Sequence, residues 1–210
     1  MLWNRVFVLT ALAALGAFAV SPSALSQPKE AAETQVESKV DASKLSKNKR
    51  TWLGLYVTAE EAAEALKQDP DALLIDVRAR GEVMYVGQPD ASDKNIPIAE
   101  FGPYKFDAKN GSYKLVANPQ FVDAVEELVA EKGGNKDTTI IMMCRSGSRS
   151  AAAADLLAKR GYKNVYSMVD GFEGDMDKKT GRRSLNGWKN ADLPWTYRFE
   201  KDEIYQSPAN

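Results

Sequence analysis

The sequence predicts an α/β domain, in which a parallel β-sheet carries helices on both faces. Two nearly continuous apolar runs of strand length, Leu73–Val77 and Thr139–Met143, indicate strands that are buried on both sides. Segments with the apolar spacing of helices lie between the strand-like runs. Strands that alternate with helices form parallel sheets covered on both faces, because each helix buries its apolar side against the sheet.

The first elements of the domain follow from local signals. A short strand is expected at Leu55–Val57. Thr58 followed by Glu61 has the pattern of a capping box, which predicts a helix that runs to about Gln68. A further short strand is expected at Asn95–Ile98, after the first buried strand.

A hairpin and a second helix are predicted in the middle of the chain. Asn110-Gly111 is a tight-turn signal between two strand-like segments, Tyr104–Phe106 and Tyr113–Val116. Asn118-Pro119 provides a cap and a first helical residue, and Gly133-Gly134 ends the helix that follows.

The last part of the domain begins at the second buried strand. A polar loop leads from it into a helix from about Arg149 to Arg160, which Gly161 stops, and Asn164–Val169 forms the last strand. In parallel sheets ligands bind at the carboxyl ends of the strands. Cys144 stands at such an end, which makes it the first candidate for a functional residue.

Residues 1–26 have the pattern of a secretory signal peptide. Arg5 is followed by the uncharged apolar run Val6–Val20, and Ala24–Ser26 offers small residues for cleavage. The run is shorter than the roughly 20 residues that a membrane-spanning helix needs. We therefore expect a cleaved signal, a periplasmic or secreted protein, and no stable membrane insertion.

The segment after the signal, residues 27–50, is rich in Lys, Glu, Ala and Ser and has few large apolar residues. Such a composition buries too little surface to offset the entropy of ordering, so a disordered linker is expected. The remainder, residues 51–205, is expected to form one domain.

Composition excludes several classes of function. The 210 residues include no histidine and one cysteine, which rules out mechanisms that use an imidazole base, histidine-bearing zinc sites and intramolecular disulfides. Acidic and basic residues nearly balance, at a formal net charge of -1, so no nucleic-acid partner is expected. No metal or other cofactor is expected either.

The loop after the second buried strand carries the candidate chemistry. Arg145 and Arg149 place two positive charges beside Cys144. The loop N–H groups can form a nest around a sulfur anion, with Gly147 allowing close approach, and the following helix start adds partial positive charge. These features stabilise a thiolate nucleophile without a histidine. The alternative is a buried structural cysteine at the end of a core strand.

Four segments of the chain together carry a family resemblance. Cys144–Ser150 resembles the active-site loop of the rhodanese family of sulfurtransferases. Asp76–Arg78 resembles the family's motif after its second strand, and Asp170–Gly174 with Asp192–Pro194 resembles its C-terminal signature. The similarity covers about Leu55 to Trp195 and makes the predicted domain rhodanese-like.

The resemblance implies a persulfide cycle. In the cycle that the resemblance implies, Cys144 attacks the outer sulfur of thiosulfate or of a persulfide donor. It then passes that sulfur to a thiophilic acceptor, such as cyanide, a thiol or a protein. Arg145 and Arg149 would bind the anionic oxygens of the donor. Asp76 and Arg78 would brace the loop, with a plain surface ion pair as the alternative. Three amides would hold the persulfide, those of Ser146, Gly147 and Ser148.

The sequence departs from the family pattern in several places. The histidine of the family's Gly-His-Ile-Pro stretch is missing, and Val86–Pro89 and Asn95–Pro97 stand in that region. The region Ala99–Ala117 is longer than in a minimal domain. A polar insertion, Asp175–Asn186, precedes Gly187; we expect a solvated loop, with a flap over the site as the alternative.

Two other functions are compatible with the sequence. Cysteine phosphatases and arsenate reductases of the same fold place an arginine one residue further from the cysteine than Arg149 lies, and Ser150 occupies that position here. The shorter loop favours a sulfur atom over a phosphate group. The second alternative is a non-catalytic sulfur carrier or docking module that uses Cys144 without turnover.

Overall fold

The computed structural model of the chain describes residues 36–109 and 111–206, apart from the side chains of residues 103 and 104. The predicted signal peptide, residues 1–26, and the first part of the predicted linker, 27–35, lie outside the described residues. Within the described ranges, no helix has both the length and the apolar character that crossing a bilayer would need.

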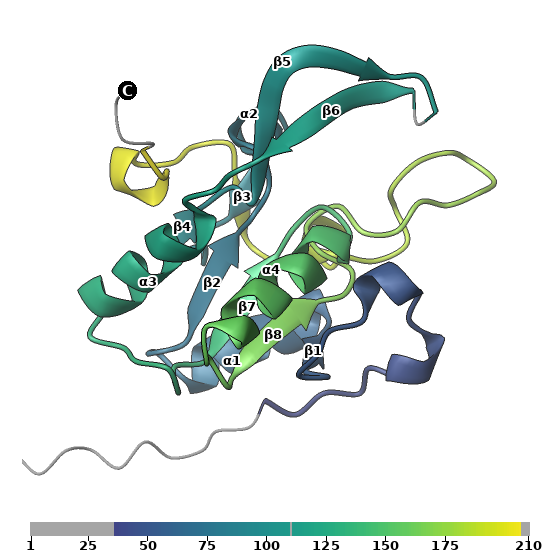
Figure 1. Cartoon of the computed structure of the whole chain (residues 1–210). Coiled ribbons are helices and arrows are strands. Elements are labelled where there is room, and N and C mark those ends of the chain that lie inside the picture. The colour runs from purple at the N-terminus through teal and green to yellow at the C-terminus, as the bar shows by residue number, and fades with distance from the viewer. Residues whose placement is uncertain (1–35, 110, 207–210) are drawn as a thin grey trace, which may run out of the picture. The chain divides into compact units, whose positions relative to one another are not determined.

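A five-stranded sheet forms the centre of the domain (Figure 1). Every neighbouring pair in it is parallel, and Asp76 lies opposite Met143 in the register of the two central strands. The carboxyl ends of these strands therefore meet at one edge. In spatial order the strands are β1 (Tyr56–Val57), β8 (Val165–Met168), β7 (Ile140–Met143), β2 (Leu73–Asp76) and β4 (Lys94–Asn95).

Helices cover both faces of this sheet, which confirms the predicted fold class. Leu73 and Ile75 pack in one cluster with the apolar residues of α3 (Phe121–Glu131) and α4 (Ser148–Lys159). Leu74, between them in the strand, packs on the other face in a cluster with α1. The period of two along β2 thus supplies both halves of the core. α1 spans Ala59–Gln68, and the short α2 spans Arg80–Val86.

A capping side chain sets where α1 begins, and an Asx turn precedes α3. At α1 the hydroxyl of Thr58 accepts the N–H of Glu61, and the Glu61 carboxylate accepts the N–H of Thr58, which is the predicted capping box. The start of α3 was predicted two residues too early. Asn118 accepts the N–H of Gln120 in an Asx turn and donates to the carbonyl of Pro97, so it anchors the chain before the helix.

Two antiparallel pairs lie outside the main sheet. The predicted hairpin is formed by β5 (Ala99–Asp107) and β6 (Ser112–Ala117), with an irregularity between Phe101 and Phe106. Gly111 in its turn has φ +59°, a conformation that glycine adopts without strain. The other pair joins β3 (Gln88–Pro89) to β9 (Trp195–Thr196). It brings the C-terminal part of the domain against α2.

The C-terminal segment returns to the edge of the main sheet. After the 3-10 turns η3 (Trp188–Asn190) and η4 (Lys201–Glu203), the N–H of Tyr205 donates to the carbonyl of Asn95 at 2.9 Å. Ile204 forms a parallel bridge to the same residue. The short edge strand β4 is thereby covered by the chain's own end.

Residues 36–50, which composition predicts to be disordered, instead contact the domain. They carry the 3-10 turns η1 (Ala42–Lys44) and η2 (Lys47–Lys49). The Lys39 N–H donates to the Glu61 carboxylate at 2.6 Å, and Lys49 pairs with Asp175 at 2.8 Å. These polar contacts, together with the packing of Val36 against the core, hold the segment, and composition alone does not reveal them.

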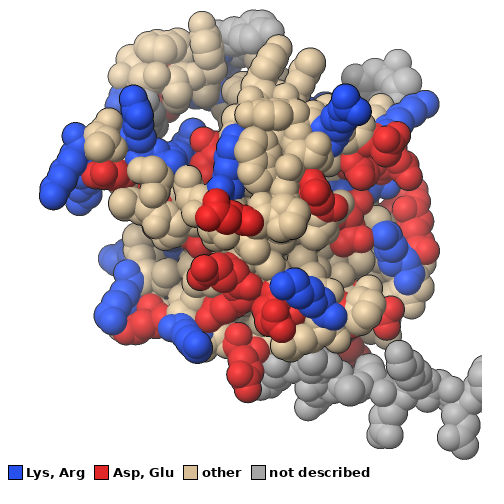
Figure 2. Space-filling view, turned by 180° about the vertical axis from the view of Figure 1, so that it is seen from behind, with Lys and Arg blue, Asp and Glu red and all other residues tan. Residues whose placement is uncertain are grey.

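Charge is mixed on the surface of the domain. On the face drawn in Figure 2, acidic and basic side chains are both spread over the surface, and several acidic side chains adjoin one another at the right. This distribution agrees with the formal net charge of -1.

Candidate active site

Cys144 follows the last residue of β7 at the carboxyl edge of the sheet. Its side chain is buried, at 1% exposure, and the N–H of Gly147 donates to its Sγ at 3.1 Å. Gly147 has φ +101°, and a Cβ there would lie 2.2 Å from the carbonyl oxygen of Val169. Burial is common to structural cysteines, whereas a loop N–H directed at sulfur by a glycine that no other residue can replace suits an anionic sulfur.

The predicted C-terminal signature lies directly against this loop. The N–H of Phe172 donates to the carbonyl of Cys144 at 2.8 Å, and those of Glu173 and Gly174 donate to the carbonyl of Arg145 at 3.0 and 3.2 Å. Gly171 has φ +65°, and a Cβ there would clash with the backbone of the loop. Backbone hydrogen bonds from Phe172–Gly174 therefore fix the shape of the start of the loop.

Asp76 and Arg78 form a fully buried ion pair. Both side chains have 0% exposure, and Arg78 Nη2 lies 2.5 Å from Asp76 Oδ2 while Nε contacts both carboxylate oxygens at 3.0 Å. Arg78 Nη2 also donates to the carbonyl of Gly87 at 2.7 Å. The alternative of a surface ion pair is therefore wrong.

The buried pair reaches the cysteine loop through an aromatic ring. The guanidinium of Arg78 lies 4.3 Å from the ring centroid of Phe172, whose N–H holds the carbonyl of Cys144. From the other side, the Asn95 amide donates to the carbonyls of Asp76 and Arg78, both at 2.9 Å. The predicted bracing role of the pair remains a prediction, and these contacts supply a path for it.

Arg149, predicted to bind the donor, is already paired inside the protein. Its Nη1 and Nη2 donate to the two carboxylate oxygens of Glu82 at 2.5 and 2.7 Å. Burial raises the pKa of Glu82, but the Arg149 guanidinium and the Ala79 N–H outweigh it and hold that pKa below its ordinary value. Burial likewise opposes the charge of Arg149, and Glu82 outweighs it and raises the pKa of the guanidinium.

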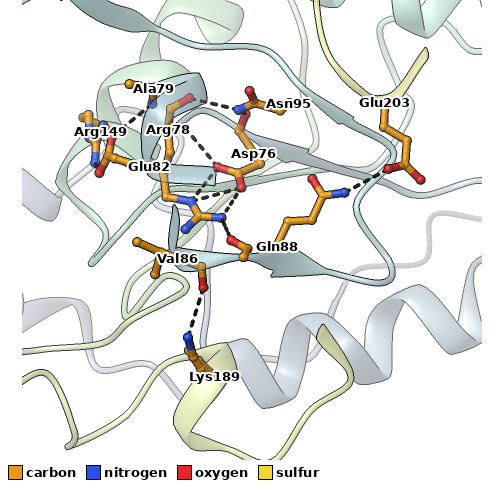
Figure 3. A network of polar contacts seen from close by, with 11 residues as sticks. Asp76, Arg78, Ala79, Glu82, Val86, Gln88, Asn95, Arg149, Lys189 and Glu203 are labelled. Atoms are coloured by element: carbon orange, nitrogen blue, oxygen red, sulfur yellow. Dashed lines mark hydrogen bonds and ion pairs between the residues drawn. The ribbon is translucent and has the colours of Figure 1, made fainter. Parts of the chain in front are cut away.

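Glu82 is a site residue that the sequence patterns did not single out. It lies in the first turn of α2, and its carboxylate also accepts the N–H of Ala79 at 3.0 Å (Figure 3). Lys189 Nζ donates to the carbonyl of Val86 at the other end of the helix, at 3.0 Å. An acidic residue near the start of a helix, shortly after Asp76–Arg78, was the signal that could have identified it.

The remaining loop residues have different surroundings. Arg145 is exposed, and Ser146 and Ser148 are half-buried. α4 begins at Ser148, so its positive end points at the loop, as predicted. Of the three amides expected to hold a persulfide, that of Gly147 bonds to Sγ; the part of the other two stays a prediction.

Asp170 ties the start of α1 to the residue that follows the insertion. Its side-chain oxygens accept the N–H groups of Ala59 at 2.9 Å and of Gly187 at 3.2 Å. Burial raises the pKa of Asp170 to about 6, although backbone N–H groups and the charge of Lys49 act in the opposite direction. The residue thus belongs to the frame of the site.

These features define an α/β domain that presents a cysteine in a loop of backbone N–H groups, at the carboxyl edge of a parallel sheet. Such a loop can hold a thiolate or a persulfide anion. The family model described as the STR4 middle domain matches residues 55–201 of the chain.

Several proteins from other organisms are similar to this one. Uncharacterized protein RP600 of Rickettsia prowazekii is 35% identical over 141 residues, covering 67% of this chain and 96% of that protein. The rice protein THYLAKOID RHODANESE-LIKE, chloroplastic (Oryza sativa subsp. indica) is 31% identical over 140 residues, which are 67% of this chain and 25% of the rice protein. The thiosulfate sulfurtransferase GlpE of Haemophilus influenzae is 38% identical over 138 residues, which are 66% of this chain and 90% of that protein. The chain therefore belongs to the rhodanese family.

A solved structure agrees with this assignment of the fold. The crystal structure of Rv0390 from M. tuberculosis is similar with a TM-score of 0.52 and 29% sequence identity, and the match covers 67% of this chain and 96% of that one. The α/β class predicted from the alternation of strands and helices is the fold of the family.

Proposed function

We propose that the protein is a sulfurtransferase that carries a sulfane sulfur as a persulfide on Cys144. The donor would be thiosulfate or another persulfide-type donor, and the acceptor a thiophile such as a thiol or cyanide. The observation that carries the proposal is the N–H of Gly147, which donates to Sγ of Cys144 at 3.1 Å in a loop fixed by its neighbours. A sulfur anion is the group that such a fixed donor stabilises best.

The reaction would proceed in two displacements. The Cys144 thiolate attacks the outer sulfur of thiosulfate, so that an Sγ–S bond forms, the S–S bond of thiosulfate breaks, and sulfite leaves with the electron pair. An acceptor thiolate then attacks the outer sulfur of the persulfide. The Sγ–S bond breaks, and its electron pair returns to Cys144 as thiolate. No external oxidant and no imidazole base are needed.

Two further observations support this assignment over phosphate chemistry. Ser150 has 0% exposure within α4, so the position where a cysteine phosphatase carries its arginine faces the core. Arg149 is paired with Glu82 and would need to leave it to hold a phosphate. The name of the Haemophilus influenzae relative, a thiosulfate sulfurtransferase, points in the same direction.

Intact-mass measurement after treatment with thiosulfate tests the proposal. The wild-type protein should gain the mass of one sulfur atom, and a thiol reductant should remove it. Cys144→Ser should gain none, because a hydroxyl is not ionised near neutral pH. Hydrolysis of phosphate esters by the wild type, together with no mass gain, would make the phosphatase the better assignment. Multiple turnover with thiosulfate and cyanide separates an enzyme from a carrier that is loaded once.

We also propose that the protein is exported to the periplasm or beyond the cell. Support comes from Arg5, the apolar run Val6–Val20 and the small residues Ala24 and Ser26. N-terminal sequencing of the protein isolated from its host should begin near Gln27. Recovery of Met1 in the membrane fraction would mean an uncleaved anchor.

A further inference from the structure

The insertion Asp175–Asn186 is rooted at the cysteine loop. The residue before it, Gly174, donates its N–H to the carbonyl of Arg145 at 3.2 Å. The last residue of the insertion, Asn186, closes its base, because its side-chain oxygen accepts the N–H of Asp175 at 2.7 Å. The segment is the yellow-green loop that projects from the domain in Figure 1. It is thus attached to Arg145, the residue that follows Cys144.

Within the insertion, Arg183 turns back toward this root. Its backbone forms an antiparallel bridge with Met176, and its Nη1 donates to the carbonyl of Gly174 at 2.6 Å. Gly174 therefore links the guanidinium of Arg183 to the backbone of Arg145. The adjacent Arg182 is exposed, and only its backbone takes part in the turn.

The charges of Arg145 and Arg183 have no carboxylate partner among the described residues. Arg145 is exposed and Arg183 half-buried, and neither forms an ion pair there. The nearby carboxylates are Glu173 and Asp175, of which Asp175 pairs with Lys49 at 2.8 Å. Burial and the positive charge of Arg145 lower the pKa of Arg183, while Cys144 and the two carboxylates act in the opposite direction.

Arg183 is thus anchored through Gly174 to the backbone of the cysteine loop, and its charge and that of Arg145 repel each other. A small anion between them would relieve the repulsion and gain charge-assisted hydrogen bonds. Arg149 is the other cation of the loop, and its guanidinium nitrogens lie 2.5 and 2.7 Å from the Glu82 carboxylate oxygens. Its charge is therefore already neutralised inside the protein.

We propose that Arg183 of the insertion, together with Arg145, binds the oxyanion end of the sulfur donor, so that the insertion selects anionic donors such as thiosulfate. This inference rests on the proposed function for the identity of the donor. The sulfonate-like oxygens would lie between the two guanidiniums, and the outer sulfur would face Cys144. The insertion is then a specificity-determining segment rather than the solvated loop expected from its composition.

Kinetics of the full chain with Arg183→Gln and Arg182→Gln test the assignment. Loss of a charge-assisted hydrogen bond should raise the KM for thiosulfate about tenfold in Arg183→Gln, with little change in kcat. Arg182→Gln, the matched control, should behave as wild type. With an uncharged organic trisulfide as donor, both variants should match wild type, and Arg183→Lys should recover part of the thiosulfate affinity. Equal effects of the two glutamine variants, or an equal loss with the uncharged donor, would overturn the proposal.

A binding measurement separates this inference from sulfur transfer itself. In the Cys144→Ala background, titration calorimetry with thiosulfate should show binding that Arg183→Gln weakens about tenfold and Arg182→Gln does not. If the wild type forms no persulfide but this pattern holds, the anion site stands and the proposed function fails. If the persulfide forms but Arg183→Gln and Arg182→Gln bind thiosulfate alike, the anion site is wrong and the proposed function stands.

Discussion

Arg149 of the cysteine loop and Arg183 of the insertion beside it hold their positive charges in opposite ways. In the loop, Arg149 is clamped by both oxygens of Glu82, and below the loop Arg78 is clamped by Asp76. In the insertion, Arg183 contacts a backbone carbonyl and has no carboxylate partner in the described part of the chain. Arg149 and Arg78 thus belong to a rigid frame, while the insertion contributes a charge without a carboxylate partner in the described part of the chain.

The difference teaches how to read arginines in a motif. An arginine next to a nucleophile is readily taken for a substrate contact, but a bidentate bond to a carboxylate already offsets its charge. An arginine held by a neutral carbonyl keeps its charge available. The partner of each guanidinium, rather than its distance along the sequence from Cys144, separates the frame from the binding surface.

The buried pair of the frame should produce the largest effect on stability. Asp76→Asn leaves Arg78 charged and uncompensated at 0% exposure, so the free energy of unfolding should fall by about 3–5 kcal/mol. Urea denaturation followed by fluorescence measures it. Glu100→Gln is the control, because it removes the partner of Arg80 in a more exposed pair and should cost less than about 1 kcal/mol. Similar losses in both variants would remove the distinction between frame and surface.

Asp170, where the two regions meet, should make stability depend on pH. Its folded-state pKa of about 6 lies above the ordinary value of 3.8, so the folded state holds the proton more tightly than the unfolded state. The stability that Asp170 adds to the folded state is fully present below about pH 4 and is lost as pH rises to about 6. It amounts to at most about 3 kcal/mol in the free energy of unfolding. Unfolding midpoints of wild type and Asp170→Asn between pH 4 and 8 measure it. The difference should change below pH 6 and stay constant above; a difference that does not vary with pH would contradict the assignment.

Arg149→Ala should distinguish positioning from donor binding, with the smallest effect of the three. Loss of this partly exposed, charge-assisted pair should raise the activation free energy of sulfur transfer by about 1.5–3 kcal/mol or less. If Arg149 acts by positioning the loop, transfer from thiosulfate and from an uncharged trisulfide should slow equally. Steady-state kinetics with both donors measure this. A loss confined to thiosulfate would restore the direct role that the sequence predicts for Arg149.

The sequence predicted most of the fold. The buried strands around Leu74 and Ile141, the capping box at Thr58 and the hairpin at Gly111 follow from local patterns, and the structure confirms each. The place of Cys144 at a strand end followed from the same patterns. These features depend on neighbours in sequence, which is why they can be read without a structure.

Other features could not be predicted because they depend on distant partners. Glu82 and Arg149 are 67 positions apart, and the pattern around each residue does not indicate that the two form a pair. The seven-residue helix α2 is too short to show a clear apolar period. The segment 36–50 is held by Glu61 and Asp175, which composition cannot indicate.

The return of the chain to Asn95 bears on how the protein behaves in concentrated solution. A parallel sheet ends in strands whose outer N–H and C=O groups can recruit strands from other molecules. Here Ile204 and Tyr205 occupy that position on β4. A protein shortened before Ile204 would keep its cysteine loop but expose a pairing edge. The first effect of this shortening would be self-association of the protein through β4, before any loss of activity at Cys144.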